Sequence, residues 1–318
     1  MKSIDRNGTY TTGALRLDVL SQSQVEAIHL ATLDVLKNTG IKVESKQALK
    51  FFAAYGAHIE KKSSYSIVKM PFQLVEDCIR SAPEKVVYHG RVANSDYTFL
   101  PHDYSFTLFG ECINIIDVNS RQVRKSTKKD CQETALICDY IDQIKVVERP
   151  LNPSDVPVDT QSLHNAEAIF TNTTKHTFIG VDNVESLKRM AKMAEICVGG
   201  KEQFKERKIF TTTVCPVSPL FLTQSCCDII IESARQGIGL LIFPMPLAGA
   251  TSAVTMAGTL ITFNAEVLSA LVLAQLVSKG IPCLYGSAST IKDLTHVDAS
   301  LGAPEMTLLG GGSARLAR

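Results

Sequence analysis

The chain has 318 residues, 45% hydrophobic and 20% charged, so it can bury a full core as one large α/β domain or as two smaller ones. With 33 Lys and Arg residues against 32 Asp and Glu residues, the net charge is +1, and no long-range field favours nucleic acid or a membrane surface as a partner. The nine scattered cysteines are typical of reduced thiols, which predicts a cytoplasmic protein.

The first third of the chain predicts a helical region with short extended segments. Three amphipathic helices are expected, over 21–40, 46–55 and 71–81. A capping box formed by Ser21 and Gln24 begins the first helix, and Gly40 ends it. We therefore assign residues 1–104 to an N-terminal helical cap with a small antiparallel element.

From residue 105 onward, apolar runs of strand length alternate with segments of helical period. The predicted strands cover 113–117, 144–147, 177–181, 209–214, 239–243 and 282–285. The helices that follow them cover 127–141, 159–172, 183–198, 222–236, 253–278 and 303–318. This alternation predicts a parallel sheet covered by helices. No glycine-rich phosphate loop follows a strand, so we predict a (β/α)8 TIM-type barrel in residues 105–318.

The predicted barrel is incomplete at its C-terminal end. A closed barrel of this class has about eight strands, whereas about six βα units are identified. Either the missing units are present in an unrecognised form, or the chain is the front part of a longer protein. The most hydrophobic stretch, 253–277, is interrupted by Asn264, Glu266 and Gln275 and predicts a buried helix, not a membrane span.

Reacting side chains in such a barrel lie at the carboxyl ends of the strands and in the loops that follow. Two of these loops, CPVSP and PMPLAGAT, place prolines directly after a strand. Because proline fixes its own φ angle and lacks an N–H, these loops are expected to be rigid over the barrel mouth. Rigid loops with few charges favour an apolar ligand surface over a phosphate site.

Seven segments form a set that extends over nearly the whole chain: LSQSQVEAIHLATLDVLKNTGIKVES, NPSDVP, TNTTK, CPVSPL, PMPLAGATSAVTMAG, NAEVLSALVLAQL and YGSAS. Together they resemble the trimethylamine methyltransferase superfamily, whose non-pyrrolysine members demethylate quaternary amines such as glycine betaine. The resemblance implies a barrel that transfers a methyl group from the amine to the Co(I) of a cobamide carried by a separate corrinoid protein. Family members continue well past the position of Arg318.

The substrate class follows from one departure from the family pattern. Archaeal trimethylamine enzymes place pyrrolysine in the barrel, and this sequence shows no such residue. The resemblance then implies a quaternary amine, whose nitrogen already carries the charge that makes it a leaving group. The protein's contribution is to desolvate and orient the cation, and no single catalytic residue is identified.

A methylammonium group is held by aromatic faces and by a carboxylate, at ~0.5 to 2 kcal/mol per cation–π contact. The predicted substrate-binding residues are Phe109, Glu111, His164, Phe243, Tyr285 and Ser287. The sequence has no Trp, so the Phe and Tyr residues supply the faces and Glu111 the carboxylate. A solvated hairpin charge is an equal interpretation of Glu111, and a structural role is the commoner one for a helical histidine such as His164.

Residues after two further strands are predicted to contact the cobamide: Cys215, Ser218, Met245, Pro246, Gly249 and Thr251. Cys215 has no base near it in the sequence, so it is not predicted to be a nucleophile. Met245 and the prolines beside it fit the amine pocket or the corrinoid contact equally well. Asn264 and Glu266 are interpreted as buried polar groups satisfied by their neighbours.

The first interpretation is thus a corrinoid-dependent methyltransferase for a small quaternary amine, in a barrel of a size that commonly forms homo-oligomers. One alternative is a zinc-dependent methyltransferase barrel, which requires His and Cys ligands from separate strand ends. No His follows a predicted strand, so no metal site is expected. The other alternative is a betaine-binding protein, or an inactive fragment whose open barrel exposes strand edges.

Overall fold

The computed structural model describes residues 19–99 and 105–318, which form two compact units that interleave along the chain. The described part of the first unit comprises 84–99, 105–213 and 237–239. The second unit comprises 19–83, 214–236 and 240–318. The predicted boundary at residue 104 lies outside the described residues, and that division remains a prediction.

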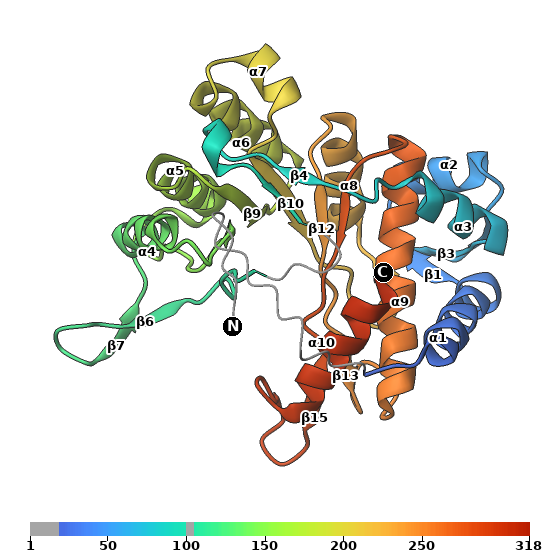
Figure 1. Ribbon diagram of the computed structural model, residues 1–318. Coiled ribbons are helices and arrows are strands. Elements are labelled where there is room, and N and C mark those ends of the chain that lie inside the picture. Colours follow the sequence, from blue (N-terminus) through green and yellow to red (C-terminus); the bar gives the residue numbers. More distant parts are fainter. Residues whose placement is uncertain (1–18, 100–104) are drawn as a thin grey trace, which may run out of the picture. The chain divides into compact units, whose positions relative to one another are not determined.

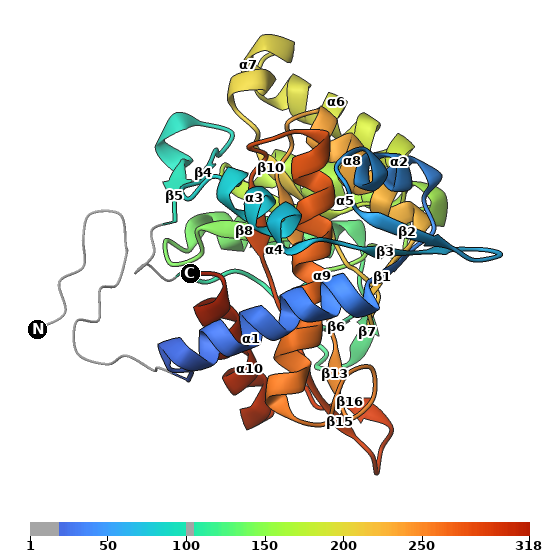
Figure 2. The ribbon, with the colours of Figure 1, turned by 90° about the vertical axis from the view of Figure 1, so that its right-hand side faces the viewer.

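The second unit is organised around one long helix, α9 (Met256–Val277). The helices packed against it are α1 (Gln22–Asp34), α2 (Lys46–Ala54), α3 (Phe72–Ser81), α8 (Gln224–Arg235) and α10 (Pro304–Leu316). Figure 1 shows α1 beside α9, and Figure 2 shows α1 running across it. Among the described helices, only α9 is long and apolar enough to cross a membrane, and 83% of its apolar window is buried. The predicted buried helix is therefore confirmed.

Local sequence signals place the first elements of this unit where they were predicted. The Ser21 side chain accepts a hydrogen bond from the Gln24 amide, and the Gln24 side chain accepts one from the Ser21 amide, which completes the capping box. The helix continues as a π-helical turn, Val35–Thr39, and ends at Gly40. Gly40 has φ +76°, and a Cβ there would lie 2.6 Å from the Val68 carbonyl oxygen, so only glycine fits.

A small sheet covers α2 in the same unit. Its strand order is β11 (Phe221–Leu222), β1 (Ile41–Val43), β3 (Ser66–Lys69), β2 (His58–Lys61). The β1–β3 and β3–β2 pairs are antiparallel, and β11 runs parallel to β1. The predicted antiparallel element is thus present, and β2 forms an edge of this sheet.

The parallel strands of the first unit are β8 (Val146–Glu148), β9 (His176–Gly180) and β10 (Phe210–Val214), whose last residue belongs to the second unit. The accompanying helices are α4 (Lys128–Tyr140), α5 (Gln161–Asn172), α6 (Val184–Cys197) and α7 (Lys201–Glu206). The Phe210 ring packs against Phe170 of α5 and Phe204 of α7. Side chains alternate along a strand, so Phe210 lies on the face that the helices cover, and its neighbours in sequence lie on the opposite face.

The predicted barrel strand over 113–117 is wrong. Within it, β6 (Asn114–Ile116) pairs antiparallel with β7 (Val123–Lys125), and Figure 1 shows the two strands as a projecting hairpin. The Asp117 carboxylate accepts hydrogen bonds from the amides of Asn119 and Ser120, which reverses the chain directly after β6.

The segment before this hairpin takes the place beside β8 instead. Phe106 bridges Ile144 and Cys112 bridges Leu151, both in parallel orientation. The pairing is interrupted between these bridges, where the Thr107 hydroxyl donates to the Val146 carbonyl. An irregular strand of this kind has no clear periodic signal, whereas the apolar run that follows it does, so the sequence pattern favours the wrong segment.

The second unit contributes the parallel pair β12 (Leu240–Ile242) and β14 (Cys283–Tyr285). Between β14 and α10 the chain forms a hairpin of β15 (Thr290–Asp293) and β16 (Asp298–Ala299), and β13 (Leu247–Ala248) runs parallel to β15. The first unit also carries a two-stranded hairpin, β4 (Val87–Tyr88) with β5 (Tyr97–Thr98). The mixed α/β class with parallel strands is confirmed, and closure into a barrel remains a prediction.

Candidate functional site

The carboxyl end of β8 in the first unit carries an acidic side chain, Glu148. The strand register places Glu148 opposite Phe178 of β9, and Phe178 opposite Thr211 of β10. These three residues share one face, whereas Phe210 points to the other face, under α5 and α7. Glu148 therefore lies on the face of the strands that these helices leave uncovered.

Glu148 is a half-buried carboxylate without a charge partner in the described ranges. No side chain or amide in residues 19–99 and 105–318 donates a hydrogen bond to it, and no cation forms an ion pair with it. Burial alone raises its pKa to about 7. At neutral pH the side chain is thus divided between a neutral acid and a carboxylate whose charge is poorly solvated, and a bound cation would favour the carboxylate.

The neighbouring segment 109–111 approaches the backbone of β8 very closely. The Glu111 amide donates to the Arg149 carbonyl at 3.1 Å. A Cβ on Gly110 would lie 2.3 Å from that carbonyl oxygen, closer than two such atoms can approach. The absence of a side chain at Gly110 is what allows this crossing, and the crossing brings the Glu111 carboxylate to Arg149.

Glu111 and Arg149 form an ion pair. The Arg149 side chain is 8% exposed and the Glu111 side chain 50% exposed, and Arg149 also donates to the Gly180 carbonyl at 3.4 Å. The pair is therefore anchored by the arginine. Since the guanidinium offsets the charge of Glu111, Glu148 is the carboxylate at this strand end without a described cation partner, and the assignment of Glu111 to substrate binding remains a prediction.

Glu148 was missed in the sequence analysis although a signal for it was present. It directly follows the predicted strand 144–147, and a charged residue at the carboxyl end of an apolar strand is where the fold rule places chemistry. The sequence does not reveal that Glu148 is half-buried or that the neighbouring Glu111 pairs with Arg149, and these two observations make Glu148 a candidate.

The amino-terminal part of the same face is filled by rings. His176 lies at hydrogen-bond distance from the His89 carbonyl through Nδ1 (3.0 Å) and from the Thr211 hydroxyl through Nε2 (2.9 Å). Tyr88 and Phe178 pack against its ring. Burial lowers the pKa of His176 to about 4, so the ring is neutral at physiological pH and acts as a structural group. The polar group of this face without a described partner, Glu148, is thus at its carboxyl end.

The two other candidates of the first unit lie in different surroundings. Phe109 is 54% exposed next to Gly110. His164 lies in the α4–α5 interface, where its Nδ1 is 3.1 Å from the Lys128 ammonium, and Lys128 also pairs with Glu167. Phe109 therefore lies next to the segment that approaches β8, whereas the described contact of His164 is with Lys128 of α4. Their assignment to substrate binding remains a prediction.

In the second unit, the predicted residues Phe243 and Tyr285 point to opposite faces of the parallel pair. A Cβ on Gly286 would lie 2.5 Å from the Phe243 ring and 2.7 Å from Leu241, so these three positions share a face. Tyr285, one residue earlier, points toward α9, where its hydroxyl donates to Asn264 Oδ1 at 2.5 Å. The structure therefore does not bring the two rings together, and Tyr285 has a buried structural partner.

The polar residues of α9 are buried and hydrogen-bonded, as interpreted from the sequence. Asn264 also donates to the Thr32 hydroxyl at 3.0 Å. Glu266 accepts from the Ser218 hydroxyl at 2.8 Å and from the Leu220 amide at 2.9 Å. Burial raises the pKa of Glu266 to about 7 despite these two bonds. The predicted cobamide contact Ser218 is thus part of a loop that Glu266 holds in place.

The PMPLAGAT segment forms a compact, uncharged loop. The Leu247 carbonyl accepts from the amides of Ala250, Thr251 and Ser252, and the Leu247 amide donates to the Thr251 hydroxyl. The amides of residues 250–252 are therefore bonded within the loop. Exposed side chains in and beside this loop belong to Met245, Val254 and Met256, while Pro246 is buried and Gly249 exposed.

The structure brings Ser287 next to this loop. The Ala288 amide donates to the Pro244 carbonyl, and the Ser287 hydroxyl contacts Ser289 at 3.1 Å. Cys215, after β10, is exposed. Within the part of the chain that the structure describes, no group of three His, Cys, Asp or Glu side chains is placed to hold a metal ion.

Comparison with known proteins gives a family match over almost the whole chain. Residues 3–318 match the family model for trimethylamine methyltransferase (MTTB). Trimethylamine methyltransferase MttB of Desulfitobacterium hafniense is 42% identical over 318 residues, which are 100% of this chain and 64% of the relative. The glycine betaine methyltransferase of Desulfitobacterium hafniense is 27% identical over 95% of this chain and 62% of its own length.

A more distant likeness concerns the fold alone. The crystal structure of the Methanosarcina barkeri monomethylamine methyltransferase (MtmB) superposes with a TM-score of 0.50 and 11% identity. The match covers 95% of this chain and 64% of that one. The chain thus spans less than two thirds of the length of the relatives it matches.

Proposed function

The chain belongs to the trimethylamine methyltransferase (MTTB) family, and from this premise we propose that the complete protein transfers a methyl group from a small quaternary amine, such as glycine betaine, to the Co(I) of a separate corrinoid protein. The family match supports the reaction class. The single structural observation that carries the substrate class is Glu148, a half-buried carboxylate with no described charge partner at the carboxyl end of β8.

A quaternary ammonium fits the surroundings of Glu148 because its positive charge is permanent and it needs no hydrogen-bond acceptor. It has no N–H to donate and cannot lose its charge, so a carboxylate and an aromatic face hold it through electrostatics alone. Glu148 supplies the charge, and its register partner Phe178 lies next to it on the same face. A cation at this place would also favour the ionised form of Glu148, whose pKa burial has raised.

The role of Glu148 in the reaction is binding and orientation. The nitrogen is positively charged in the substrate and becomes neutral as the methyl group leaves. The attraction to Glu148 is therefore at least as strong in the ground state as in the transition state, and it lowers KM without lowering the chemical barrier. We expect loss of this carboxylate to raise KM more than it lowers kcat.

The cobamide of the partner, which supplies Co(I) as the methyl acceptor, suits the surface of the PMPLAGAT loop. Residues 243–256 contain no charged side chain, and the amides after Leu247 are bonded within the loop. Met245 and Val254 are exposed there and can pack on an apolar macrocycle. Glu266 positions the adjacent Ser218 loop by its two hydrogen bonds.

The complete protein, incubated with glycine betaine, a Co(I) corrinoid protein and a reductant, is expected to produce the absorbance of methyl-Co(III). Binding of glycine betaine without this absorbance would contradict methyl transfer and favour a betaine-binding protein. A parallel calorimetric titration of glycine betaine into Glu148→Gln, expected to show weakened binding, tests the site without depending on the partner.

Trimethylamine is the second candidate substrate, because several relatives, among them the one at 42% identity, are named for it. The two amines differ in their ability to donate a hydrogen bond when charged. At equal concentration and pH 8, tighter binding of glycine betaine than of trimethylammonium supports the first candidate, and the reverse order supports the second.

A further inference from the structure

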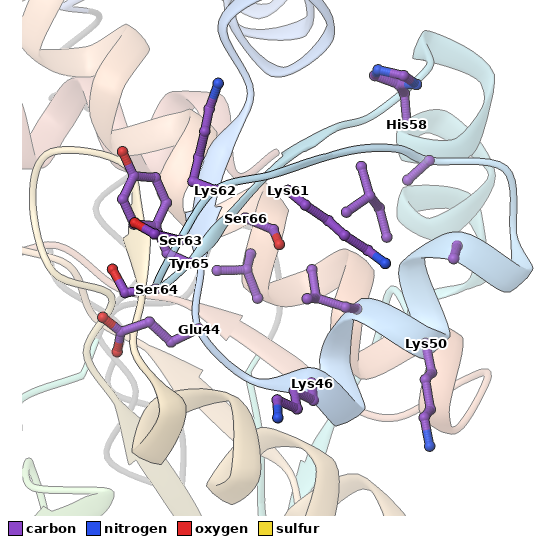
Figure 3. A pocket seen from close by; sticks show the side chains of 15 residues that line it. Glu44, Lys46, Lys50, His58, Lys61, Lys62, Ser63, Ser64, Tyr65 and Ser66 are labelled. Atoms are coloured by element: carbon purple, nitrogen blue, oxygen red, sulfur yellow. The ribbon is translucent and has the colours of Figure 1, made fainter.

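A cavity of about 760 Å³ lies in the second unit, between α2 and the β2–β3 hairpin (Figure 3). Its inner wall is apolar and includes Val43, Leu49, Ala53 and Ile59. None of the residues predicted for amine or cobamide binding lines it. Its size lies in the range of cavities that hold a small ligand, and it exceeds the volume of any single side chain.

The sheet register explains which side chains face this cavity. Val43 of β1, Ser66 of β3 and Lys61 of β2 form one row across the sheet. Because side chains alternate along strands, this row lies on the same face as Ile59, Val68 and Ile41, two residues away. Ile41, Val43 and Val68 are fully buried. Lys61 thus extends the buried face at the sheet edge, and Figure 3 shows it pointing into the cavity.

The rim of the cavity has an excess of positive charge: four lysines line it, with Glu44 as the carboxylate among the described lining residues. Lys46 and Lys50 of α2 line it one helical turn apart, and like charges at this spacing repel each other. Among the described residues, no carboxylate lies within ion-pair distance of Lys46, Lys50 or Lys61. The nearby acids have other partners: Glu44, which also lines the cavity, pairs with Lys42, and Glu60 pairs with Lys69 and lies 3.9 Å from Lys62.

The backbone beside the cavity is also available. β2 pairs with β3 along one edge, and no strand of the described residues pairs with its other edge. Its sequence, His58–Lys61, contains no proline, so it can accept a further strand. An added strand would place alternate side chains on the face of Ile59 and Lys61, over the cavity.

We propose that this edge docks an extended acidic segment of a partner protein. Apolar side chains of that segment enter the cavity, and the carboxylates that flank them pair with Lys46, Lys50 and Lys61. Inward-pointing lysines also protect sheet edges from unwanted pairing, but edge protection alone does not account for an apolar cavity ringed by further lysines on α2. The proposal is independent of methyl transfer.

The test uses the chain described here and a fluorescein-labelled peptide, acetyl-Glu-Leu-Glu-Val-Glu-Leu-amide, with its Glu→Gln analogue as the uncharged control. Fluorescence polarisation in 50 mM salt measures binding, and hydrogen exchange locates it. The variant Lys46→Gln/Lys50→Gln/Lys61→Gln removes the rim charge. Lys188→Gln/Lys201→Gln/Lys279→Gln removes the same net charge from exposed positions elsewhere.

We expect the acidic peptide to bind at least tenfold more tightly than its analogue, with added exchange protection in residues 57–66. The rim variant should lose at least tenfold in affinity and the control variant less than twofold. Equal losses in the two variants, or protection outside 57–66, would overturn the proposal. So would absence of peptide binding together with rim-dependent binding to phosphatidylglycerol vesicles, which would assign the rim to a lipid surface.

Discussion

The two strand-end regions of the molecule differ in how they use polar groups. In the first unit, charged side chains gather at the end of β8, where Glu111 is offset by Arg149 and Glu148 is not. In the second unit, the ends of β12 and β14 carry an uncharged loop whose polar groups are bonded internally. The first region thus holds a carboxylate without a described cation partner and the second an uncharged loop, which fits the proposed division between cation binding and cobamide contact.

The largest expected effect tests the rigidity of the second region. Glu266→Ala leaves the Ser218 hydroxyl and the Leu220 amide without their acceptor and opens a cavity in a fully buried position. We expect the free energy of unfolding to fall by about 3 kcal/mol, measured by urea denaturation. A loss below about 1 kcal/mol would show that the loop does not depend on Glu266.

The same residue gives a dependence of stability on pH. The pKa of Glu266 is about 7 in the folded protein, above its ordinary value of 4.5, so the folded state binds the proton more tightly than the unfolded state. Its contribution is fully present below pH 4.5 and is lost as pH rises through 7. Glu148 acts in the same direction. We expect Glu266→Gln to flatten the decline in unfolding free energy between pH 5 and 8, and an unchanged slope would contradict this.

The second prediction concerns the crossing that builds the charged region. Gly110→Ala forces a methyl group against the Arg149 carbonyl, at a cost of about 2 kcal/mol in unfolding free energy. Gly310→Ala is the matched control, because no atom lies near a Cβ there and alanine favours the α10 helix by about 0.5 to 1 kcal/mol. Destabilisation by both substitutions, or by neither, would show that the close approach is not the cause.

The third prediction separates the two carboxylates of the first region. Glu148→Gln should weaken binding of glycine betaine about tenfold, which corresponds to about 1.4 kcal/mol, as measured by calorimetry. Glu111→Gln removes a carboxylate that already has a cation and is half exposed, so its effect should stay below threefold. Equal losses would mean that Glu148 has no special role.

The smallest effect distinguishes a structural role from a binding role for Tyr285. Tyr285→Phe removes the hydroxyl that Asn264 accepts from, and we expect a loss of about 1 kcal/mol in unfolding free energy. The affinity for glycine betaine should not change. Weaker binding at unchanged stability would instead support the assignment made from sequence.

Much of the architecture could be predicted because its signals are local. The capping box at Ser21, the glycine at position 40 and the apolar length of α9 each act within a few turns of chain. The hairpin after residue 113 was missed because the turn at Asp117 depends on a side-chain hydrogen bond that an apolar run conceals. In its place the irregular segment 106–112 pairs with β8.

The candidate site was less predictable because it depends on contacts between distant residues. The rule of strand ends selected segments that follow strands, including the PMPLAGAT loop, but it could not predict the pairing of Glu111 with Arg149, 38 positions along the chain. The register of β14 against β12 determines which face of the strand pair Tyr285 lies on, and the sequence of β14 alone does not reveal that register. Which carboxylate lacks a cation partner is therefore a property of the folded chain.

The most direct test of the central claim is the pH dependence of glycine betaine binding, since the quaternary nitrogen does not titrate. If ionisation of Glu148 strengthens binding about tenfold and its pKa is about 7, the affinity should rise about fivefold between pH 6 and 8. The rise should vanish in Glu148→Gln and persist in Glu266→Gln. A flat profile in the unaltered chain, or a rise retained in Glu148→Gln, would contradict the account.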